Sequence, residues 1–334
     1  MKPWILNAVI AGIIGSLLFV VLIRPYIRWA HQHGKIGKDM HKPGLPPVAE
    51  SGGLVFFLSA IVIELTLHYL GGLSSNQLYT ILLITILAGI IGIIDDELVL
   101  SPRGKVLGGL VLGVPFILFN SYDPHLAIPL IGSARFTILY PIALPIAMTV
   151  FANAANMSDT HNGVLHLSSI FIYLTAIISG YILWLHGGTS IAIVLGLPFL
   201  LLHLAALHYN MFPARVFNGD VGSITTGTLV GLVAILGKVE LAVILAMMPW
   251  IINGYGNIAS LRGFKGRHQI HKRPVIVEGW EIKRSNYDNV PITLVRLLTS
   301  DYSLTEPEIV ASYIILSALA ASLSILVALF TYTL

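Results

Sequence analysis

The chain has 334 residues, of which 56% are hydrophobic and only 10% are charged, with a formal net charge of +3. Soluble globular domains carry about 25% charged residues, so this composition indicates a protein embedded in a bilayer. The small net charge and the lack of a separate basic domain argue against a nucleic-acid binder, and the absence of cysteine excludes disulfides, thiolate metal sites and a cysteine nucleophile.

Ten apolar stretches of about fifteen to twenty residues are long enough to predict helices that cross a membrane. They are expected at residues 4–23, 53–70, 78–94, 106–119, 138–151, 165–185, 190–208, 223–236, 241–258 and 309–332. The predicted fold class is an all-α integral membrane protein, formed as a single polytopic domain over residues 1–334. With ten spans, an even number, both termini are expected on the same side of the membrane.

The lysines and arginines are distributed very unevenly over the segments between the spans. If the N-terminus is outside, the outer segments hold Lys2, Arg135 and Lys238, and the other sixteen of the 19 cations are inside. Cytoplasmic segments carry this excess of positive charge, so both termini are predicted outside. The cytosolic segments are then 31–52, 95–105, 153–163, 209–222 and 259–308. On the outer face, residues 127–131 and 135–139 flank Gly132 and Ser133, which predicts a small external β-hairpin near 127–139.

The first cytosolic segment, residues 31–52, is rich in glycine and proline, which favours a stiff loop. Lys38 in this loop is a candidate phosphate ligand, and Glu50 lies just before the second span. Within that span Glu64 and His68 are one helical turn apart and close to the outer end. We interpret them as a mutually satisfied structural pair, because unpaired polar groups are costly in lipid.

Three adjacent carboxylates, Asp95, Asp96 and Glu97, end the third apolar run, and the cations Arg103 and Lys105 follow within ten residues. Carboxylates at the mouth of a span are costly unless something holds them there. A divalent metal, a phosphate-bearing substrate or both would do so.

The segment 153–163 carries Asn153, Asn156, Asp159 and Asn162. On a helix Asn153 and Asn156 share one face, and amide and carboxylate oxygens suit either Mg²⁺ or a sugar nucleotide. The alternative is a hydrophilic turn between two spans, but four such residues in ten exceed what a turn needs.

Asp220 lies in the segment Phe217-Asn-Gly-Asp-Val-Gly-Ser223, which opens the eighth span. Glycines on both sides of the aspartate let the backbone approach a ligand closely, and the N-terminus of the following helix favours anions. Taken alone, this segment could equally be a turn and a helix cap.

The last cytosolic segment concentrates basic and imidazole side chains at Arg262, Lys265, Arg267, His268, His271, Lys272 and Arg273. Such a patch suits a pyrophosphate, which arginine binds bidentately, and the alternative is an anchor for anionic lipid head groups. The His-x-x-His spacing lacks further ligands arranged for zinc. With the other polar clusters at the inner span ends, the patch predicts a site for a phosphorylated, metal-dependent substrate at the cytosolic interface.

In this order the segments resemble the polyprenyl-phosphate N-acetylhexosamine-1-phosphate transferases, over most of the chain from Gly37 to about Pro274. Asp95-Asp96 resembles the family's paired aspartates, Asn153-x-x-Asn156-x-x-Asp159-x-x-Asn162 its Asn-rich segment, and Phe217-Asn-Gly-Asp220-x-Gly-Ser223 its metal-binding segment. Residues 37–43 and 47–53 resemble the dolichyl-phosphate GlcNAc branch of archaeal type. Asn162 also favours that branch, because the MurNAc enzymes usually have aspartate there.

The resemblance implies transfer of GlcNAc-1-phosphate from UDP-GlcNAc to a polyprenyl (dolichyl) phosphate, giving polyprenyl-pyrophosphate-GlcNAc and UMP. This is the first membrane step of lipid-linked glycan assembly for protein N-glycosylation. The implied cofactor is Mg²⁺, with Mn²⁺ as a substitute, and the active site would face the cytosol from an archaeal plasma membrane or the ER. Expected partners are the UDP-sugar, the polyprenyl phosphate and membrane lipids. No nucleic-acid partner is expected, and the sequence leaves open whether the protein forms a homodimer.

The resemblance also assigns roles to individual residues of this chain. The implied catalytic residues are Asp95, Asp96, Lys105, Asp159, Arg267 and His268. The implied substrate-binding residues are Lys38, Glu50, Asn153, Asn162 and Arg273, and the implied metal ligands are Asp220 and Asn156.

Two alternatives stay open from the sequence. One is the same reaction with another UDP-HexNAc or with UDP-MurNAc-pentapeptide as donor, and the other is a multi-pass lipid or solute transporter. Transporters place charged residues near the bilayer midplane and often show inverted repeats. This chain instead keeps its polar clusters at the inner span ends, which favours the enzyme.

Overall fold

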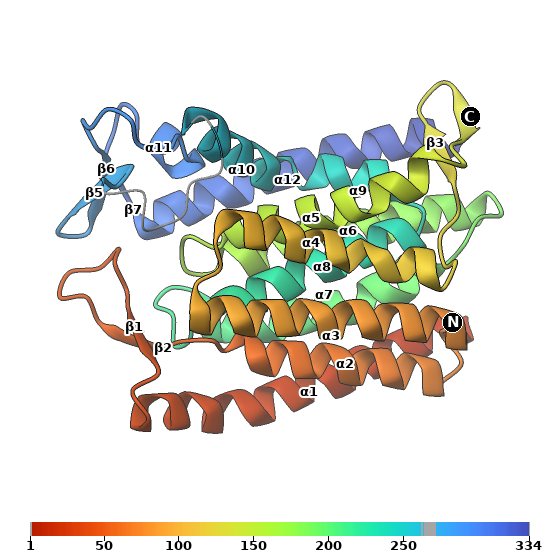
Figure 1. The fold of residues 1–334 in the computed structure, drawn as a ribbon, viewed down its shortest axis with the longest axis horizontal. Helices are drawn as coiled ribbons and strands as arrows, with labels where there is room; N and C mark the ends of the chain where they lie inside the picture. Colours follow the sequence, from red (N-terminus) through yellow and green to blue (C-terminus); the bar gives the residue numbers. More distant parts are fainter. Residues whose placement is uncertain (1, 262, 264–271, 334) are drawn as a thin grey trace.

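Twelve helices and seven short strands make up the computed structural model, which describes residues 2–261, 263 and 272–333 (Figure 1). The helices are α1 (Pro3–Gln32), α2 (Gly53–Tyr69), α3 (Ser75–Leu98), α4 (Pro102–Leu118), α5 (Leu139–Ser158), α6 (Val164–Leu185), α7 (Ile191–Asn210), α8 (Gly219–Leu236), α9 (Glu240–Ala246), α10 (Met248–Ser260), α11 (Leu294–Leu298) and α12 (Glu306–Tyr332). The strands are β1 (Ile36–Lys38), β2 (Pro47–Ala49), β3 (His125–Ile128), β4 (Gly132–Arg135), β5 (Val275–Glu278), β6 (Glu281–Arg284) and β7 (Leu304–Thr305).

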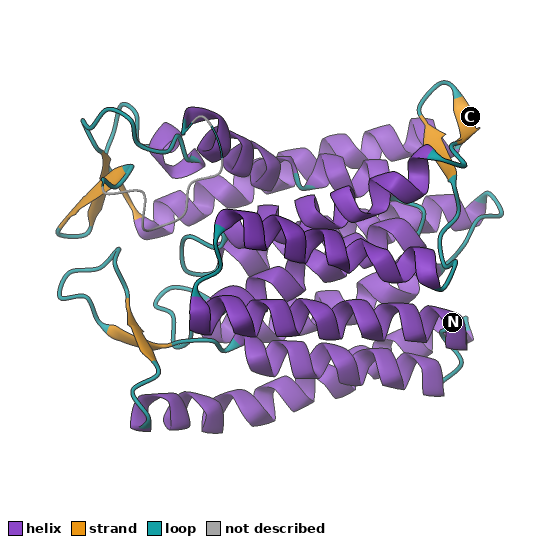
Figure 2. Ribbon diagram, in the orientation of Figure 1, coloured by secondary structure: helices purple, strands orange, loops and turns teal. Residues whose placement is uncertain are grey.

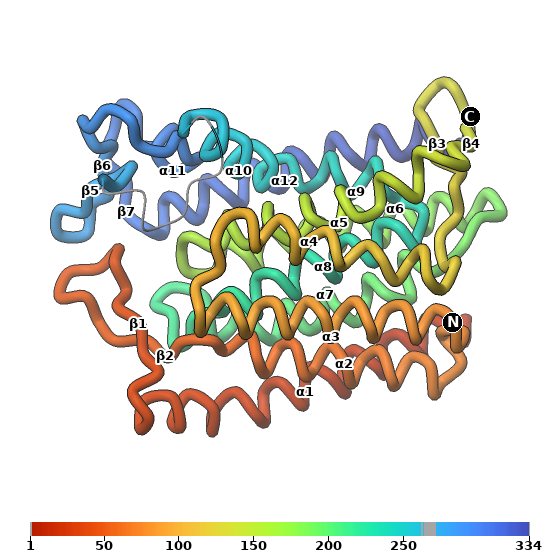
Figure 3. Tube along the Cα trace, viewed as in Figure 1, coloured from red at the N-terminus to blue at the C-terminus, as the bar shows by residue number. Residues whose placement is uncertain are grey.

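The long helices run side by side as a bundle, and the strands lie only at its two ends (Figure 2). One end carries the antiparallel pair β1–β2 and the three-stranded sheet β5–β6–β7. We call it the polar end. The opposite end carries the β3–β4 pair and both ends of the chain (Figure 1). Following the trace in Figure 3, α3 and α5 finish at the polar end and α8 begins there.

Helix α8 forms the centre of the bundle and packs against α2, α3, α5, α6, α7 and α9. Nearly all of its residues from Val221 to Ile235 are buried. A helix that is apolar on all sides and surrounded by other helices is stabilised by packing rather than by contact with lipid. Its N-terminal residues are therefore held in fixed positions relative to the ends of α3 and α5.

Nine of the ten predicted spans each coincide with one helix, but the helices differ in their ability to cross a bilayer. Among the described residues, seven helices are long and apolar enough to do so: α1, α3, α5, α6, α7, α8 and α12. Helices α2 and α4 have 17 residues each, at the lower limit of a span. The protein is thus mostly helical with several apolar spans, in keeping with the predicted class.

The predicted span at 241–258 is not one continuous helix. It is broken into α9 and α10, whose axes differ by 66°. Pro249 lies in the first turn of α10, where its missing N–H is tolerated, whereas inside a continuous helix its ring would clash with the preceding turn. If the bent pair counts as one crossing, the number of candidate spans rises to eight.

The β-hairpin is displaced from the predicted residues. Its strands pair His125 with Arg135 and Ile128 with Gly132, so residues 129–131 form the turn and not part of the first strand. Pro129 has no N–H for a strand ladder, which ends the strand there. Of the predicted second strand, 135–139, only Arg135 belongs to β4; residues 136–138 lead into α5, which begins at Leu139.

The proposed pairing of Glu64 with His68 is wrong, although both residues have structural partners. Glu64 Oε1 accepts a hydrogen bond of 2.6 Å from the Thr85 hydroxyl on α3, and the side chain is fully buried. His68 Nδ1 lies 2.9 Å from the carbonyl of Leu73 at the end of the same turn. Spacing along one helix did not reveal that α3 supplies a closer partner.

Candidate functional site

A cavity of about 830 Å³ opens at the polar end, between α3, α4, α5, α8 and α10. Its size is within the range of small-molecule and cofactor sites. Seven of the predicted site residues line it: Glu50, Asp95, Asp96, Lys105, Asn153, Asn156 and Asp220. These residues come from four segments that are far apart in the sequence.

Lys105 is the central cation of this cavity. Its Nζ lies 2.5 Å from Asp95 Oδ2 and 3.6 Å from Asp220 Oδ2, so it joins the end of α3 to the start of α8. The other oxygen of Asp95 accepts a 2.9 Å hydrogen bond from the backbone N–H of Leu100. Asp95 is buried, whereas Lys105 and Asp220 are each about one-third exposed or less. Asp95 therefore holds the ammonium group in place, and the ammonium group faces the cavity.

Asp96 has a different role from its neighbour. Its carboxylate accepts hydrogen bonds from the backbone N–H groups of Asp220, at 2.6 Å, and of Val221, at 3.4 Å. The hydroxyl of Ser51 donates a third, at 3.1 Å. The first N–H groups of a helix have no partner within the helix, and its N-terminus attracts negative charge. Asp96 thus caps α8 from another helix and fixes the backbone of Asp220.

The amide of Asn156 orients the side chain of Asp220. Asn156 Nδ2 donates to Asp220 Oδ1 at 2.5 Å and to the Ser223 hydroxyl at 2.9 Å. Both bonds use the amide nitrogen, so the amide oxygen is the atom of Asn156 that can act as a metal ligand. Asn153, one turn earlier, lines the same cavity, but its amide donates to the Thr149 carbonyl within α5 at 2.9 Å.

Glycines bring these helices close enough for the contacts to form. A Cβ added at Gly92 of α3 would lie 2.3 Å from the Cα of Val221, and one at Gly53 of α2 would lie 2.2 Å from the Cα of Gly222. No real Cβ can be accommodated at such distances from backbone atoms. The α2–α8 and α3–α8 crossings therefore depend on hydrogen in place of a side chain, and the second one brings Asp95 and Asp96 to Asp220.

Asp159 lies behind the cavity and is held by Asn218. The amide nitrogen of Asn218 donates to both carboxylate oxygens, at 3.2 and 3.1 Å. The pKa of Asp159 is raised to about 7, mainly by burial; the Asn218 bonds lower it in part, and the carboxylates of Asp220 and Asp96 add to the increase. Asp159 is therefore a group whose charge changes near neutral pH.

Two buried histidines continue this chain of hydrogen bonds into the bundle. His166 Nε2 lies 2.8 Å from Asn218 Oδ1, and His166 Nδ1 lies 2.8 Å from His203 Nδ1. Because the amide oxygen of Asn218 can only accept, Nε2 of His166 carries the proton. Nδ1 of neutral His166 then accepts from His203, which assigns the tautomer of both rings from the network. No sequence pattern indicated this arrangement.

Asn162 is paired deep in the structure and does not line the cavity. Its side-chain amide donates to Asp39 Oδ2 at 3.0 Å, and its backbone N–H donates to Glu306 Oε1 at 2.9 Å. Lys42 forms ion pairs with both of these carboxylates, at 3.0 Å to Glu306. Burial alone would raise the pKa of Asp39, but Lys42 and Asn162 lower it below its usual value.

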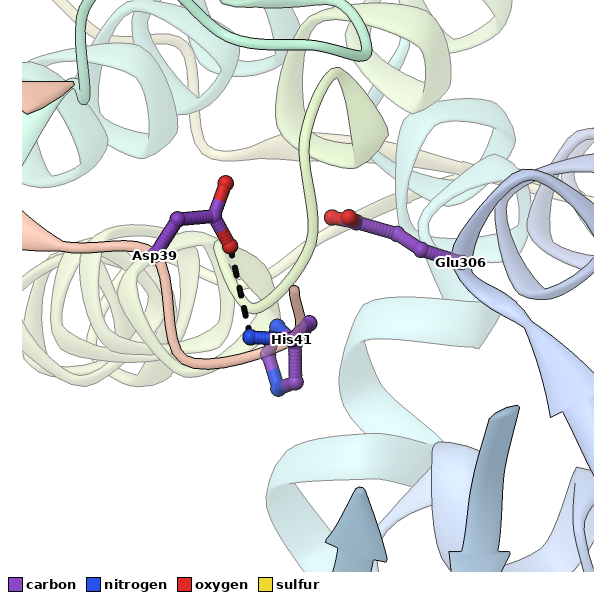
Figure 4. A group of neighbouring side chains, drawn as sticks. All are labelled: Asp39, His41 and Glu306. Carbon is purple, nitrogen blue, oxygen red and sulfur yellow. Dashed lines mark hydrogen bonds between the residues drawn. The ribbon is translucent and has the colours of Figure 1, made fainter. Parts of the chain in front are cut away.

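Asp39, His41 and Glu306 come close enough to hold a metal, with one ligand atom each within 4.8 Å of the others (Figure 4). The two carboxylates already share the ammonium group of Lys42, which is buried with them. A metal ion there would have to share the space with this fixed positive charge. We therefore interpret the cluster as a structural link between the β1–β2 loop, the α5–α6 loop and α12.

The remaining predicted residues are not brought into the cavity. Lys38, in β1, and Arg273 are exposed, and neither is among the described residues that line it. Arg267 and His268 lie outside the described residues. Conversely, sequence reasoning missed Ser51, Asn218, Ser223 and Asn257, which hold or line the site. Asn218 and Ser223 belong to the segment around Asp220. Asn257 is a polar residue near the end of an apolar helix, and this placement could have identified it as a candidate site residue.

The donor set of the cavity fits a hard divalent cation. Asp95, Asp96 and Asp220 bring three carboxylates together, and Lys105 is the cation that contacts two of them. The negative charge exceeds the positive charge among these groups. Asp220 and Asn156 both line the cavity and are hydrogen-bonded to each other, and carboxylate and amide oxygens are the ligands that Mg²⁺ takes in proteins.

Comparisons with known proteins show similarity to glycosyltransferases. The sequence model of glycosyl transferase family 4 matches residues 78–238, which include α3 to α8 and most of the cavity residues. A protein of Sulfolobus acidocaldarius, provisionally named a UDP-N-acetylglucosamine–dolichyl-phosphate N-acetylglucosaminephosphotransferase, is 27% identical over 254 residues, covering 74% of this chain and 76% of the relative.

Two further relatives differ in their names. A provisionally named glycosyltransferase of Methanocaldococcus jannaschii is 28% identical and covers 96% of this chain and 95% of its own length. A phospho-N-acetylmuramoyl-pentapeptide-transferase of Streptococcus pneumoniae is 29% identical over 67% of this chain and 72% of the relative. The similarity therefore extends across enzymes named for different sugar donors.

Proposed function

Because the model of glycosyl transferase family 4 matches residues 78–238 of this chain, we propose that it transfers GlcNAc-1-phosphate from UDP-GlcNAc to a dolichyl-type polyprenyl phosphate, releasing UMP. The observation that carries this proposal is the meeting of Asp95, Asn156 and Asp220 around Lys105 in one cavity at the polar end. The archaeal relatives named for UDP-GlcNAc and dolichyl phosphate support the choice of donor and acceptor.

In the proposed reaction an oxygen of the polyprenyl phosphate forms a bond to the β-phosphorus of UDP-GlcNAc. The bond from that phosphorus to the bridging oxygen breaks, and UMP leaves with the electron pair. The acceptor phosphate is already largely ionised at pH 7, since its second pKa is about 6. The protein therefore contributes mainly orientation and charge neutralisation, rather than removal of a proton.

Asp220 and the amide oxygen of Asn156 would hold Mg²⁺, with Mn²⁺ as a substitute. When bound, the ion supplies positive charge next to the diphosphate. The bonds from Asn156 and Asp96 to Asp220 support this assignment, because they fix the side chain and backbone of the proposed ligand. Mg²⁺ usually keeps several waters and takes only one or two carboxylates, so this small set is sufficient.

Lys105 would neutralise charge on the reacting phosphates, and Asp95 would keep its ammonium group in position. This assigns Asp95 a positioning role through Lys105, and Asp96 a positioning role through α8. The apolar part of the cavity, with Val106 of α4, Ile258 of α10 and Leu261 just after α10, suits the first isoprene units of the acceptor. The tail would then leave between these two helices.

The experiment that tests the function measures UMP release from UDP-GlcNAc and polyprenyl phosphate by the purified chain. We expect release to need Mg²⁺ and to stop when EDTA removes it. Asp220→Ala and Asp95→Asn should each lower the rate by about a hundredfold or more, because the first removes the proposed metal ligand and the second removes the carboxylate that holds Lys105, so that charge on the phosphates is no longer neutralised. Near-normal turnover in both variants would reject the site.

Glu64→Gln is the matched control for these substitutions. Glu64 is a buried carboxylate on the same bundle, and its bond from Thr85 can be kept by the glutamine oxygen. We expect transfer close to that of the unmodified chain. An inactive Glu64→Gln protein that is still folded would show that loss of any buried carboxylate stops the reaction, and the site assignment would lose its support.

The sugar donor needs its own test, because the pneumococcal relatives are named for a MurNAc-pentapeptide substrate. We expect UDP-GlcNAc to be used in preference to UDP-MurNAc-pentapeptide and other UDP-HexNAc donors when they compete at equal concentration. Faster consumption of another donor would change the proposed substrate but leave the proposed reaction type in place.

A further inference from the structure

A second polar cavity lies at the same end of the bundle, on the side of α1 and α7. It has a volume of about 450 Å³ and shares no lining residue with the first cavity among the residues that the structure describes. Its charged or ionisable side chains are Arg24, Arg28, His31 and Arg215, and none of the described residues that line it is acidic. We propose that this cavity binds the phosphodiester head group of an anionic membrane phospholipid.

One tyrosine organises two of the cations. The Tyr209 hydroxyl accepts a hydrogen bond of 3.1 Å from Arg24 Nε. The guanidinium of Arg215 lies 6.0 Å from the centre of the Tyr209 ring, and the backbone N–H of Arg215 donates to the backbone carbonyl of Tyr209 at 2.8 Å. Arginines held in this way lose less freedom when they bind a phosphate, and their planar groups can contact two of its oxygens.

The surface of α1 continues from the cavity in the direction that lipid chains would take. Arg24, Arg28 and His31 are spaced three or four residues apart, as residues on one helix face are. The same spacing continues towards the N-terminus through Val21, Leu17 and Ile14, which are 66%, 58% and 41% exposed. One face of α1 therefore changes from cationic to apolar along its length, in the order of a phospholipid's head group and chains.

A simpler explanation accounts for only part of this cluster. Cations in the last turn of a helix interact favourably with its free carbonyl groups, which would suffice for His31. Arg24 lies about two turns before the end of α1, and Arg215 comes from the loop after α7. Their convergence in one cavity needs an anion, and basic cavities between helices on the cytosolic side bind lipid head groups.

The experiment measures lipid binding to the intact purified chain by native mass spectrometry, with phosphatidylglycerol and phosphatidylcholine added in equal amounts. We expect phosphatidylglycerol to bind preferentially. Arg24→Gln/Arg28→Gln should weaken this binding by about thirtyfold, since each cation near an anionic surface contributes about fivefold in affinity. The control is Arg103→Gln/Arg284→Gln, which removes two exposed cations from other elements of the polar end and should bind as the unmodified chain does.

Two further measurements distinguish a phospholipid from other occupants of the cavity. Leu17→Ser/Val21→Ser should also weaken lipid binding, because it removes the apolar face for the chains. Inorganic phosphate at millimolar concentration should not displace the lipid; full displacement would mean an anion pocket and overturn the lipid assignment. Equal binding of the two lipids, an unchanged Arg24→Gln/Arg28→Gln protein, or a dimer that dissociates on Leu17→Ser/Val21→Ser would also overturn it.

The arginine variants could unfold, so Arg28→Gln alone serves as a second variant. Arg28 is exposed, and we expect a fivefold loss of lipid affinity with an unchanged melting temperature. UMP release in detergent without phospholipid should be unaffected by this substitution. The proposed lipid site and the proposed transferase activity can therefore be rejected independently of each other.

Discussion

The carboxyl of Asp159 has a charge that depends on the pH of its surroundings. Burial raises its pKa from 3.8 to about 7, so between these values the folded protein binds a proton that the unfolded chain does not. The free energy of unfolding therefore falls as the pH rises from about 4 to about 7, compared with a protein that has a neutral residue at position 159. Above pH 7 no further loss occurs.

We therefore expect the melting temperature of Asp159→Asn, relative to the unmodified chain, to rise from pH 5 to pH 7.5 and then to stay constant. The free-energy difference is on the order of a few kcal/mol at most. Melting is measured in EDTA, so that metal binding does not contribute. A difference that is the same at all pH values would contradict the assigned pKa.

His166 positions Asn218 from inside the bundle, and this role can be tested separately. His166→Ala removes the hydrogen bond to Asn218 Oδ1, so the Asn218 amide is free to turn away from Asp159. We expect kcat for UMP release to fall roughly tenfold with little change in KM, in line with the loss of one buried hydrogen bond. His166→Gln, which can still donate, should recover part of the rate.

The control for His166 is His208→Ala. His208 is exposed near the end of α7 and packs edge-on against Tyr209. Its removal should leave kcat unchanged. Equal losses in His166→Ala and His166→Gln, with normal melting curves, would show that the hydrogen bond to Asn218 does not position the site.

Among helices, the α3–α8 crossing is the contact on which the cavity most depends. Gly92→Ala would place a methyl group against the backbone of Val221, so the helices would have to separate. Overpacking of this kind costs about 1–3 kcal/mol, and it would also pull Asp96 away from the N-terminus of α8. We expect a loss of activity larger than the loss of stability, measured by UMP release and by melting.

Gly104→Ala is the matched glycine control. A Cβ at Gly104 would be 3.5 Å from the Ser101 hydroxyl, an ordinary contact, and the residue lies in the first turns of α4 beside the cavity. Alanine there should keep both activity and melting temperature. If Gly92→Ala were equally harmless, close contact of α3 with α8 would not be what brings the carboxylates together.

The sequence predicts the positions of the helices more reliably than the role of each residue in the site. Apolar runs located every long helix, because burial in lipid or protein needs such runs. The break at Pro249 was missed because the apolar pattern continues through it. Asp95 and Asp96 are neighbours in the sequence, but successive helix residues point in directions about 100° apart. Which of the two reaches α8 depends on packing at Gly92, which the sequence alone does not reveal.

At the scale of the whole molecule, the polar end and the β3–β4 end lie at opposite ends of the bundle (Figure 1). The distribution of lysine and arginine predicts the polar end in the cytosol. The chain contains no cysteine, so a single introduced cysteine reports the side of the membrane on which it lies. Ser133 in β4 and Asn286 after β6 are both exposed and suit this purpose.

We expect a membrane-impermeant maleimide to label Ser133→Cys in intact cells, and to label Asn286→Cys only after the membrane is opened. The two variants control for one another, because each should react fully in detergent. Labelling of Asn286→Cys in intact cells would reverse the orientation and place the cavity on the outside, where nucleotide sugars are not made.

The position of Lys105 between Asp95 and Asp220 has a consequence for how the protein would respond to magnesium. If Mg²⁺ binds Asp220 as proposed, the ion and the ammonium group of Lys105 would share one carboxylate, so the longer contact of Lys105 with Asp220 would weaken. The ammonium group, still held by Asp95, would then be free to turn towards the diphosphate that arrives with the metal. Loading of the ion and of the nucleotide sugar should accordingly be cooperative, each being bound more tightly in the presence of the other.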